Sequence, residues 1–201
     1  MGLLASNTVR LLIGLIITIS LVAFFSPSAV SSVSSVPIPF TMAAALRGLD
    51  VTLEQTNKAP PSIKVSVRNN NDGPVTILTY GSPLDPLSPQ LGMLYITPID
   101  SDEPLEIQKI EVLRQWPPTE DALVEIPSGE KEEYEITLQE PVIPMDQVFE
   151  KATIQLKGTW QAVWPTERGA VDRKALEAGG TGEDALTGDF QSNIIDIHLD
   201  E

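Results

Sequence analysis

The stretch Ser62–Tyr80 constrains the fold of this chain most strongly. Ile63, Val65 and Val67 alternate with polar residues, and this period of two is typical of a half-buried strand. The run Asn69–Gly73 is made of Asn, Asp and Gly, which tolerate positive φ, so it predicts a tight hairpin turn. The residues after this turn are apolar on both faces, which predicts a central strand. Because an isolated hairpin is marginal in water, the chain must supply further strands and a second sheet.

Further strands are expected at the spacing of a sandwich. They are Leu49–Gln55, Leu94–Thr97, Leu105–Arg114, Ala122–Ile126, Glu133–Leu138, Thr153–Trp164 and Ser192–Leu199. In Leu105–Arg114 the parity of the apolar residues switches, which predicts a β-bulge near Gln108 and Lys109. The sequence therefore predicts an all-β fold, an immunoglobulin-like antiparallel β-sandwich of about seven to nine strands, preceded by an N-terminal hydrophobic helix.

The segments between these strands carry turn and helix signals. Gly81–Pro89 holds three prolines and cannot be regular, so its leucines should fold over the edge of the core. Pro127–Glu130 has the composition of a turn, and Pro144–Phe149 predicts one helical turn. The polar excursion Pro165–Phe190 should hold a short helix at Asp172–Ala178, with its first residue as the N-cap.

Shared strand parity also predicts one hydrophobic core. Its expected members are Ile63, Val65, Val67, Ile77, Tyr134, Ile136, Leu138, Ile154, Leu156, Ile195 and Ile197. Trp160 and Trp164 share a strand face, and we expect both to pack in the core rather than to form an aromatic platform for a ligand.

An apolar run without charge, Leu11–Phe25, follows Arg10. At about 1.5 Å per residue a helix of this run covers ~22 Å, less than the roughly 30 Å of a bilayer core. That length suits a signal peptide, for which Ala29–Ser31 offers a cleavage site of small residues. A helix extended through residues 9–30 would instead be long enough for a membrane anchor, and this would be the chain's only membrane contact.

The composition changes abruptly near Met42, which divides the chain into residues 1–41, a signal peptide or anchor with a flexible linker, and residues 42–201, the β-sandwich domain. As written, the chain is expected to be membrane-anchored or secreted. If translation starts at Met42, the product is cytoplasmic. The domain has no cysteine and no Asn-x-Ser/Thr acceptor, and both absences favour the cytoplasmic alternative.

Acidic residues outnumber basic residues by 28 to 13, which gives a net charge of −15. Phosphates need a basic footprint, so this charge excludes nucleic acid as an expected partner. It also disfavours an anionic membrane surface. Its simplest consequence is solubility.

Candidate catalytic residues are few. His198 is the only histidine, lies on the outward parity of the last strand, and is expected to be solvated. A Ser-His-Asp site would need a nucleophile beside it, and no Gly-x-Ser-x-Gly motif is present. One histidine without cysteine does not suffice for a structural zinc site. No phosphate-binding glycine loop is present either, so no cofactor is expected.

Clusters of carboxylates are more numerous. Asp100–Glu103 has the start of a calcium loop but lacks its glycine and its downstream glutamate. Glu120–Asp121 and Glu130–Glu133 could supply an acid and a base, but a solvated sandwich surface explains them more simply. We therefore assign no catalytic, cofactor-binding or metal-binding residue.

Several motifs recur in known proteins. The series is Val65–Asn69, Pro74–Tyr80, Gly81–Leu87, Glu120–Glu130 and Tyr134–Leu138. It resembles the pro-region of secreted fungal metalloproteases of the deuterolysin type. It is more similar to small uncharacterised fungal proteins that begin near a segment like Met42–Leu46 and share Gly81–Leu87 and Trp160–Pro165. The pro-regions are thought to assist folding of the enzyme that follows and to inhibit it. Here His-Glu-x-x-His is absent, so the resemblance implies no protease activity and carries over no catalytic residue.

The sequence thus predicts a non-catalytic binding module whose partner is another protein, of unknown identity, held through a sheet edge or the loops. Two alternatives stay open. One is an enzyme of unknown type that uses surface carboxylates, and the other is a membrane-tethered or secreted scaffold. A cleft with two carboxylates and a raised pKa would favour the enzyme.

Overall fold

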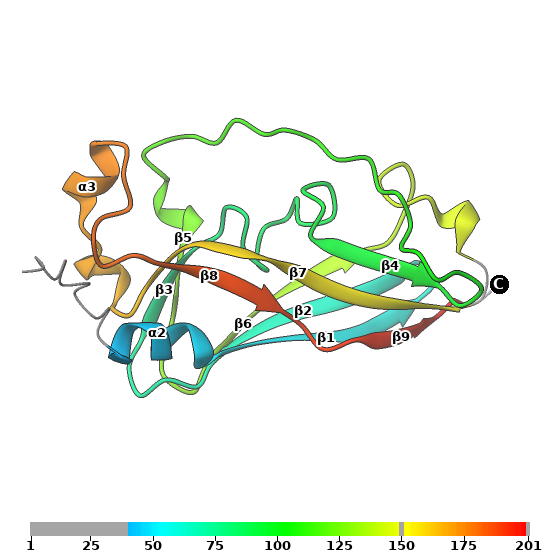
Figure 1. Ribbon diagram of the computed structural model, residues 1–201, viewed down its shortest axis with the longest axis horizontal. Helices are drawn as coiled ribbons and strands as arrows, with labels where there is room; N and C mark the ends of the chain where they lie inside the picture. The colour runs from blue at the N-terminus through cyan, green and yellow to red at the C-terminus, as the bar shows by residue number, and fades with distance from the viewer. Residues whose placement is uncertain (1–39, 149–150, 200–201) are drawn as a thin grey trace, which may run out of the picture. The chain divides into compact units, whose positions relative to one another are not determined.

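The computed structural model describes residues 40–148 and 151–199. In this part of the chain, nine strands form two antiparallel sheets, accompanied by short helices (Figure 1). The strands are β1 (Leu49–Lys58), β2 (Pro61–Asn69), β3 (Val75–Leu78), β4 (Leu94–Pro98), β5 (Leu123–Ile126), β6 (Lys131–Thr137), β7 (Lys151–Trp164), β8 (Leu186–Gln191) and β9 (Ile195–His198). The helices are α2 (Phe40–Arg47), η1 (Glu120–Ala122), η2 (Met145–Gln147), η3 (Arg168–Ala170) and α3 (Arg173–Glu177). The predicted antiparallel β-sandwich is confirmed.

The hydrophobic segment Leu11–Phe25 and the linker that follows it lie outside the described residues. Within residues 40–148 and 151–199, no helix is long and apolar enough to cross a membrane. The predicted boundary at Met42 falls inside α2, which begins at Phe40, and the start of the folded domain stays a prediction.

The smaller sheet has the strand order β1-β2-β6. Both neighbours of β2 are antiparallel, so that Val67 lies opposite Val51 and Ile63 lies opposite Ile136. β1 buries every second residue at its start, as its alternating sequence predicts. β2 is buried on both faces over most of its length, because it is the central strand of this sheet.

The larger sheet is built around β7, the longest strand. β4 and β9 both pair with the first half of β7 and must therefore lie on its opposite edges. β3 and β8 flank the second half in the same way, and β5 pairs with the far side of β3. The clean alternation in Thr153–Trp164 predicted β7 correctly because one face of this strand is buried in the core.

The predicted hairpin at Asn69–Gly73 is wrong. β2 and β3 lie in different sheets, and the residues between them cross from one sheet to the other (Figure 1). Both edges of β2 are already occupied, by β1 and β6, so β3 cannot pair with it. Asn69 is fully buried at the crossing, where its side-chain amide donates to the carbonyl oxygens of Gly73 and Ile126, both at 2.9 Å.

A second crossing lies beside the first. The turn predicted at Pro127–Glu130 is present, closed by a 3.1 Å hydrogen bond from Glu130 N to Pro127 O, and Gly129 there has a φ of 77°. It connects β5 of one sheet to β6 of the other. The backbone of Asn69 joins the two crossings, since its N–H donates to Glu130 O at 2.9 Å and its carbonyl accepts from Gly129 N at 2.8 Å.

The strand predicted at Leu105–Arg114 is also wrong. These residues belong to an irregular segment, residues 101–118, which we call the strap. Its backbone is held at separate points, from Leu105 N to Ile96 O at 2.7 Å and from Ile110 N to Gln90 O at 3.0 Å. The strap buries Ile107 and leaves Leu113 fully exposed, so the parity switch reflects irregular backbone rather than a β-bulge.

Four elements were not anticipated from the sequence, namely α2, β8 and the short helices η1 and η3. α2 lies where no element was expected, and its Ala45 is buried in the core. β8 lies within the stretch read as a polar excursion, and among its residues only Leu186 and Phe190 are buried. The short helix in that excursion is confirmed, with the Asp172 carboxylate accepting from Lys174 N at 2.9 Å.

The predicted core is confirmed. Tyr134 and Ile195 pack against it while partly buried, and the other predicted members are buried in one cluster that draws on both sheets. The prediction that both tryptophans pack in the core is also confirmed, although they lie in different clusters. Trp160 packs against Phe190 at a ring-centroid distance of 5.0 Å, whereas Trp164 belongs to a second cluster with Leu123 and Leu176.

Candidate functional site

The outer edge of β1 is closed by side-chain amides. The Asn193 side chain accepts from Leu53 N at 2.7 Å and donates to Leu53 O at 3.1 Å, which reproduces the two bonds of a paired strand. Gln55 does the same in the opposite direction, donating to His198 O at 2.7 Å and accepting from His198 N at 3.0 Å. These two amides connect the outer edge of β1 to β9 and to the short segment between β8 and β9.

The edge of β6 is arranged differently. Leu138 N donates to Pro61 O and Asn69 N donates to Glu130 O, so the even-numbered residues of this segment direct their backbone groups toward β2. By the alternation of an antiparallel ladder, the odd-numbered residues direct theirs outward. These residues are Lys131, Glu133, Glu135 and Thr137. In the described part of the chain, β6 pairs with β2 alone, so its outer edge is open.

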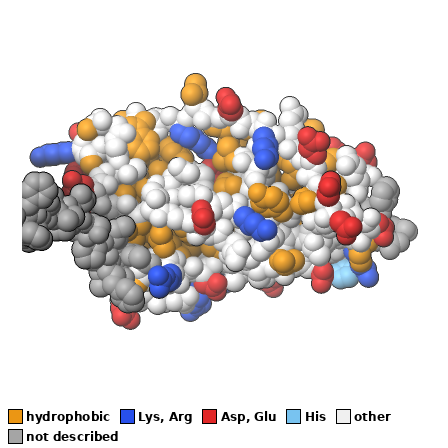
Figure 2. Space-filling view, in the orientation of Figure 1, with side chains coloured by type: hydrophobic (Ala, Val, Ile, Leu, Met, Phe, Trp, Pro, Cys, Tyr) orange, Lys and Arg blue, Asp and Glu red, His pale blue; other side chains and the backbone are white. Residues whose placement is uncertain are grey.

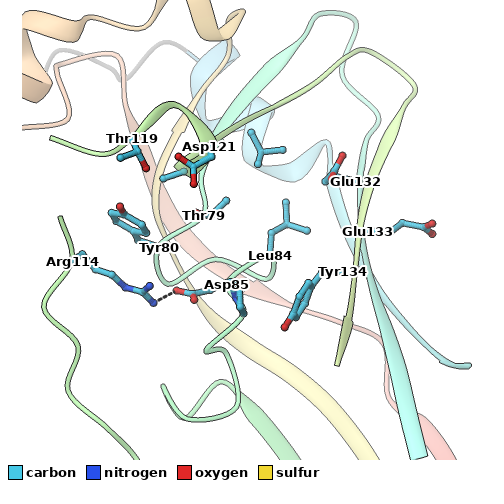
Figure 3. Close-up of a pocket in the computed structure, with 13 residues that line it drawn as sticks. Thr79, Tyr80, Leu84, Asp85, Arg114, Thr119, Asp121, Glu132, Glu133 and Tyr134 are labelled. Carbon is cyan, nitrogen blue, oxygen red and sulfur yellow. Dashed lines mark hydrogen bonds and ion pairs between the residues drawn. The ribbon is translucent and has the colours of Figure 1, made fainter. Parts of the chain in front are cut away.

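A hollow of about 370 Å³ lies beside this open edge, and we call it the β6 pocket. Figure 3 shows Tyr134 and Leu84 next to each other in it, while the carboxylate of Glu133 points away from the other labelled side chains. Residues of β6, of the loop after β3, of the strap and of the segment at η1 and β5 line it. The lining residues used below are Tyr80, Leu84, Arg114, Asp121, Val124, Glu132 and Tyr134.

A buried ion pair fixes one wall of the β6 pocket. Asp85 is 1% exposed, and its carboxylate accepts from Arg114 Nη2 at 2.6 Å, as well as from Gly81 N at 2.7 Å and Leu87 N at 3.0 Å. The Arg114 guanidinium also lies over the Tyr80 ring, 5.0 Å from its centroid. A buried carboxylate needs such partners, and the pair anchors the strap to the loop after β3.

The remaining charge of the pocket is negative. Asp121 and Glu132 line it, and within residues 40–148 and 151–199 neither forms an ion pair. Hydrogen bonds from the Thr119 side chain and from its own backbone hold the pKa of Asp121 below its ordinary value. Both carboxylates line the hollow beside the apolar side chains of Leu84 and Val124.

Two neighbouring groups on β6 have shifted pKa values. Hydrogen bonds from Lys131 and Ser66 hold the pKa of Glu133 below its ordinary value. Burial, and secondarily the Asp85 carboxylate, raises the pKa of Tyr134. A catalytic acid at neutral pH would need a carboxyl group whose pKa is raised, and both shifted carboxyls near this pocket move downward.

The candidate residues considered in the sequence do not assemble into one site. His198 is exposed on β9, and its hydrogen bonds with the Gln55 side chain use its backbone atoms. Asp100–Glu103 is an exposed turn after β4, and Glu120 pairs with Arg173 at 2.8 Å. Among the described residues, no group of three His, Cys, Asp or Glu side chains could hold a metal ion. Figure 2 shows acidic side chains crowded at the end of the domain that holds β4.

Sequence reasoning missed the two features that define the β6 pocket. The open edge follows from strand order, which no local pattern reveals. The Asp85–Arg114 pair joins positions far apart in the chain, and the only local signal was an aspartate within a proline-rich loop.

The comparisons with known proteins agree with this architecture. Residues 48–199 match the immunoglobulin-like domain family, a span that includes all nine strands described above. The chain is similar to an "Uncharacterized secreted protein" of Arthroderma benhamiae, with 31% identity over 140 residues that cover 69% of each chain. The predicted resemblance to small fungal proteins is thereby confirmed. The resemblance to protease pro-regions stays a prediction.

Proposed function

The chain belongs to the immunoglobulin-like domain family, and from this premise we propose that it is a non-catalytic module that binds another protein. The observation that carries the proposal is the open edge of β6 beside the β6 pocket. An exposed edge presents unpaired N–H and C=O groups, to which an extended segment of a partner can add as a further strand.

The contrast between the two edges of the smaller sheet supports this choice of site. Asn193 and Gln55 close the β1 edge, so a partner strand would have to displace four hydrogen bonds there. At β6 the outward backbone groups are available without such displacement.

A second candidate function is an enzyme that uses surface carboxylates, since Asp121 and Glu132 line one hollow. The lowered pKa of Asp121 supports the binding module over the enzyme, because an ionised carboxylate is a poor general acid. We expect the purified protein to hydrolyse neither peptides nor esters, with or without added zinc. Metal-dependent turnover that disappears in Glu120→Gln or Asp121→Asn would favour the enzyme instead.

We also propose that the domain is exported. The relative in Arthroderma benhamiae is named a secreted protein, and the segment Leu11–Phe25 is apolar enough for a signal sequence. N-terminal mass analysis of the native protein tests this. A chain that starts near Ser32 indicates cleavage, one that starts at Met1 indicates an anchor, and one that starts at Met42 or Ala43 would overturn export.

Photo-crosslinking from the two edges tests the binding proposal. A photoreactive amino acid at Thr137 on β6 should give a reproducible adduct with one protein of the native host, identified by mass analysis. The same group at Asp50 on β1 is the matched control and should give none. Equal adducts from both positions, or none from Thr137, would contradict binding at β6.

A further inference from the structure

We propose that the β6 edge and the β6 pocket bind a basic, extended segment of the partner polypeptide, with a lysine or arginine side chain in the pocket. This inference rests on the proposed function and names the chemistry of the partner at the same site. It follows from three features of the described residues, which are the outward backbone groups, the lining of the pocket and the sign of the charge.

The outward backbone groups of β6 can pair with a partner strand. Lys131, Glu133, Glu135 and Thr137 repeat along the edge with the spacing of a strand ladder, so a partner strand can bond to each in turn. Alternate side chains of that partner strand would project to the same side of the sheet as Tyr134 and Ile136. One of them can therefore enter the hollow that Tyr134 lines.

The lining of the β6 pocket determines which side chain of the partner fits there. Glu132 has the same parity as Tyr134 and Ile136, so it is a charged residue on the core-facing side of β6. Leu84 and Val124 offer apolar contact, while Asp121 and Glu132 offer carboxylates without an ion pair among the described residues. Lysine and arginine combine an apolar stem with a cationic head and match this lining.

The negative charge around the β6 edge disfavours other occupants of this site. A second copy of this chain paired antiparallel through β6 would bring one glutamate-rich strand against another, and with Glu133 at the centre of the pair two glutamates lie directly opposite each other, which is destabilising. An acidic or nucleic-acid segment meets the same repulsion, reinforced by the net charge of −15. The cation of the pocket, Arg114, is already engaged by Asp85 and Tyr80.

The test uses a labelled short peptide of alternating lysine and valine, with binding to the purified protein followed by fluorescence anisotropy. The matched peptides replace lysine by glutamate, or carry N-methyl groups that block one backbone edge. The basic peptide should bind, and its affinity should fall with added salt. The acidic peptide should bind at least tenfold more weakly, and so should the basic peptide methylated on the edge that faces β6.

Protein variants locate the site. Asp121→Asn combined with Glu132→Gln should weaken binding about tenfold, which corresponds to about 1.4 kcal/mol. Asp50→Asn, on the closed β1 edge, should leave it unchanged. Glu133→Pro removes an outward N–H and should abolish binding, while the protein should still fold because proline is tolerated on edge strands. Glu133→Ala keeps this N–H and should retain binding.

The outcomes separate this inference from the proposed function. Equal binding of the acidic or methylated peptide, or equal loss in Asp50→Asn, would overturn the inference. If Thr137 crosslinks a partner but the basic peptide does not bind, the proposed protein-binding function stands. The inference that the partner segment is basic and extended is then wrong. If neither occurs, both fail. Should Glu133→Pro not fold, the methylated peptide still decides whether backbone pairing is involved.

Discussion

The Asn193 side-chain amide pairs with the backbone of Leu53 as a neighbouring strand would, through hydrogen bonds of 2.7 Å and 3.1 Å. Asn193 lies between β8 and β9, so this contact connects the larger sheet to the outer edge of the smaller one. A sandwich must keep its edge strands from pairing with other chains, and here a side chain occupies the edge directly.

Asn193→Ala should therefore destabilise the protein by about 1–3 kcal/mol, because the N–H and C=O of Leu53 lose their partners in a partly buried position. It should also favour self-association through β1. Urea unfolding and size-exclusion chromatography measure the two effects. Gln191→Ala, an exposed position on β8, is the control and should change neither. Wild-type stability in Asn193→Ala would show that water replaces the amide without cost.

Asn69→Ala should be among the more damaging polar substitutions. Its side chain donates to two carbonyls and accepts from Asn71 N, and it is fully buried at the two sheet crossings. We expect a loss of about 2–4 kcal/mol in the free energy of unfolding. Asn70→Ala, at the exposed neighbouring position, should cost less than about 0.5 kcal/mol. Similar losses in both variants would mean that the loop as a whole, rather than the Asn69 amide, sets the crossing.

Arg114→Met should leave the Asp85 carboxylate without its cation while the backbone donors of Gly81 and Leu87 remain. We expect a cost of about 1–3 kcal/mol and faster proteolysis within the strap, which loses one of its anchors. Arg168→Met, at an exposed position, is the control for removal of a positive charge. Unchanged proteolysis of Arg114→Met would show that the strap is held by its other contacts.

Ile136→Ala tests the register of β6. Ile136 is 5% exposed and lies in the main core, so truncation should cost about 2–5 kcal/mol in a urea melt. Ile194→Ala, at a position 63% exposed, should be close to neutral. A loss below roughly 1 kcal/mol for Ile136→Ala would place this side chain at the surface.

Most strands could be predicted from the sequence, because apolar and polar residues alternate along a strand that has one buried and one exposed face. β7 and β6 alternate cleanly and were placed within a few residues. Strand pairing could not be predicted, since Asn69–Gly73 has the composition of a hairpin turn and serves equally well as a crossing between sheets. What excludes the hairpin is that β1 and β6 already occupy both edges of β2, a property of distant residues.

The candidate site was less accessible to sequence reasoning than the fold. Its main chemical groups are the outward N–H and C=O groups of β6, which every residue possesses and which matter only because β6 ends its sheet. Glu132 looked like one acid within a solvated cluster, although its parity with Tyr134 and Ile136 places it on the core-facing side of β6. β8 was missed because Gly188 interrupts its alternation, leaving just two buried side chains.

Amide hydrogen exchange of β6, resolved by NMR, tests the central claim most directly. In the free protein, the amides of Lys131, Glu133, Glu135 and Thr137 should exchange fast, while those of Glu132, Tyr134 and Ile136 are protected by β2. Addition of the alternating lysine and valine peptide should slow the outward amides at least tenfold and leave the Leu53 amide, already bonded to Asn193, unchanged. Outward amides that are protected before the peptide is added, or that do not respond to it, would contradict an open binding edge at β6.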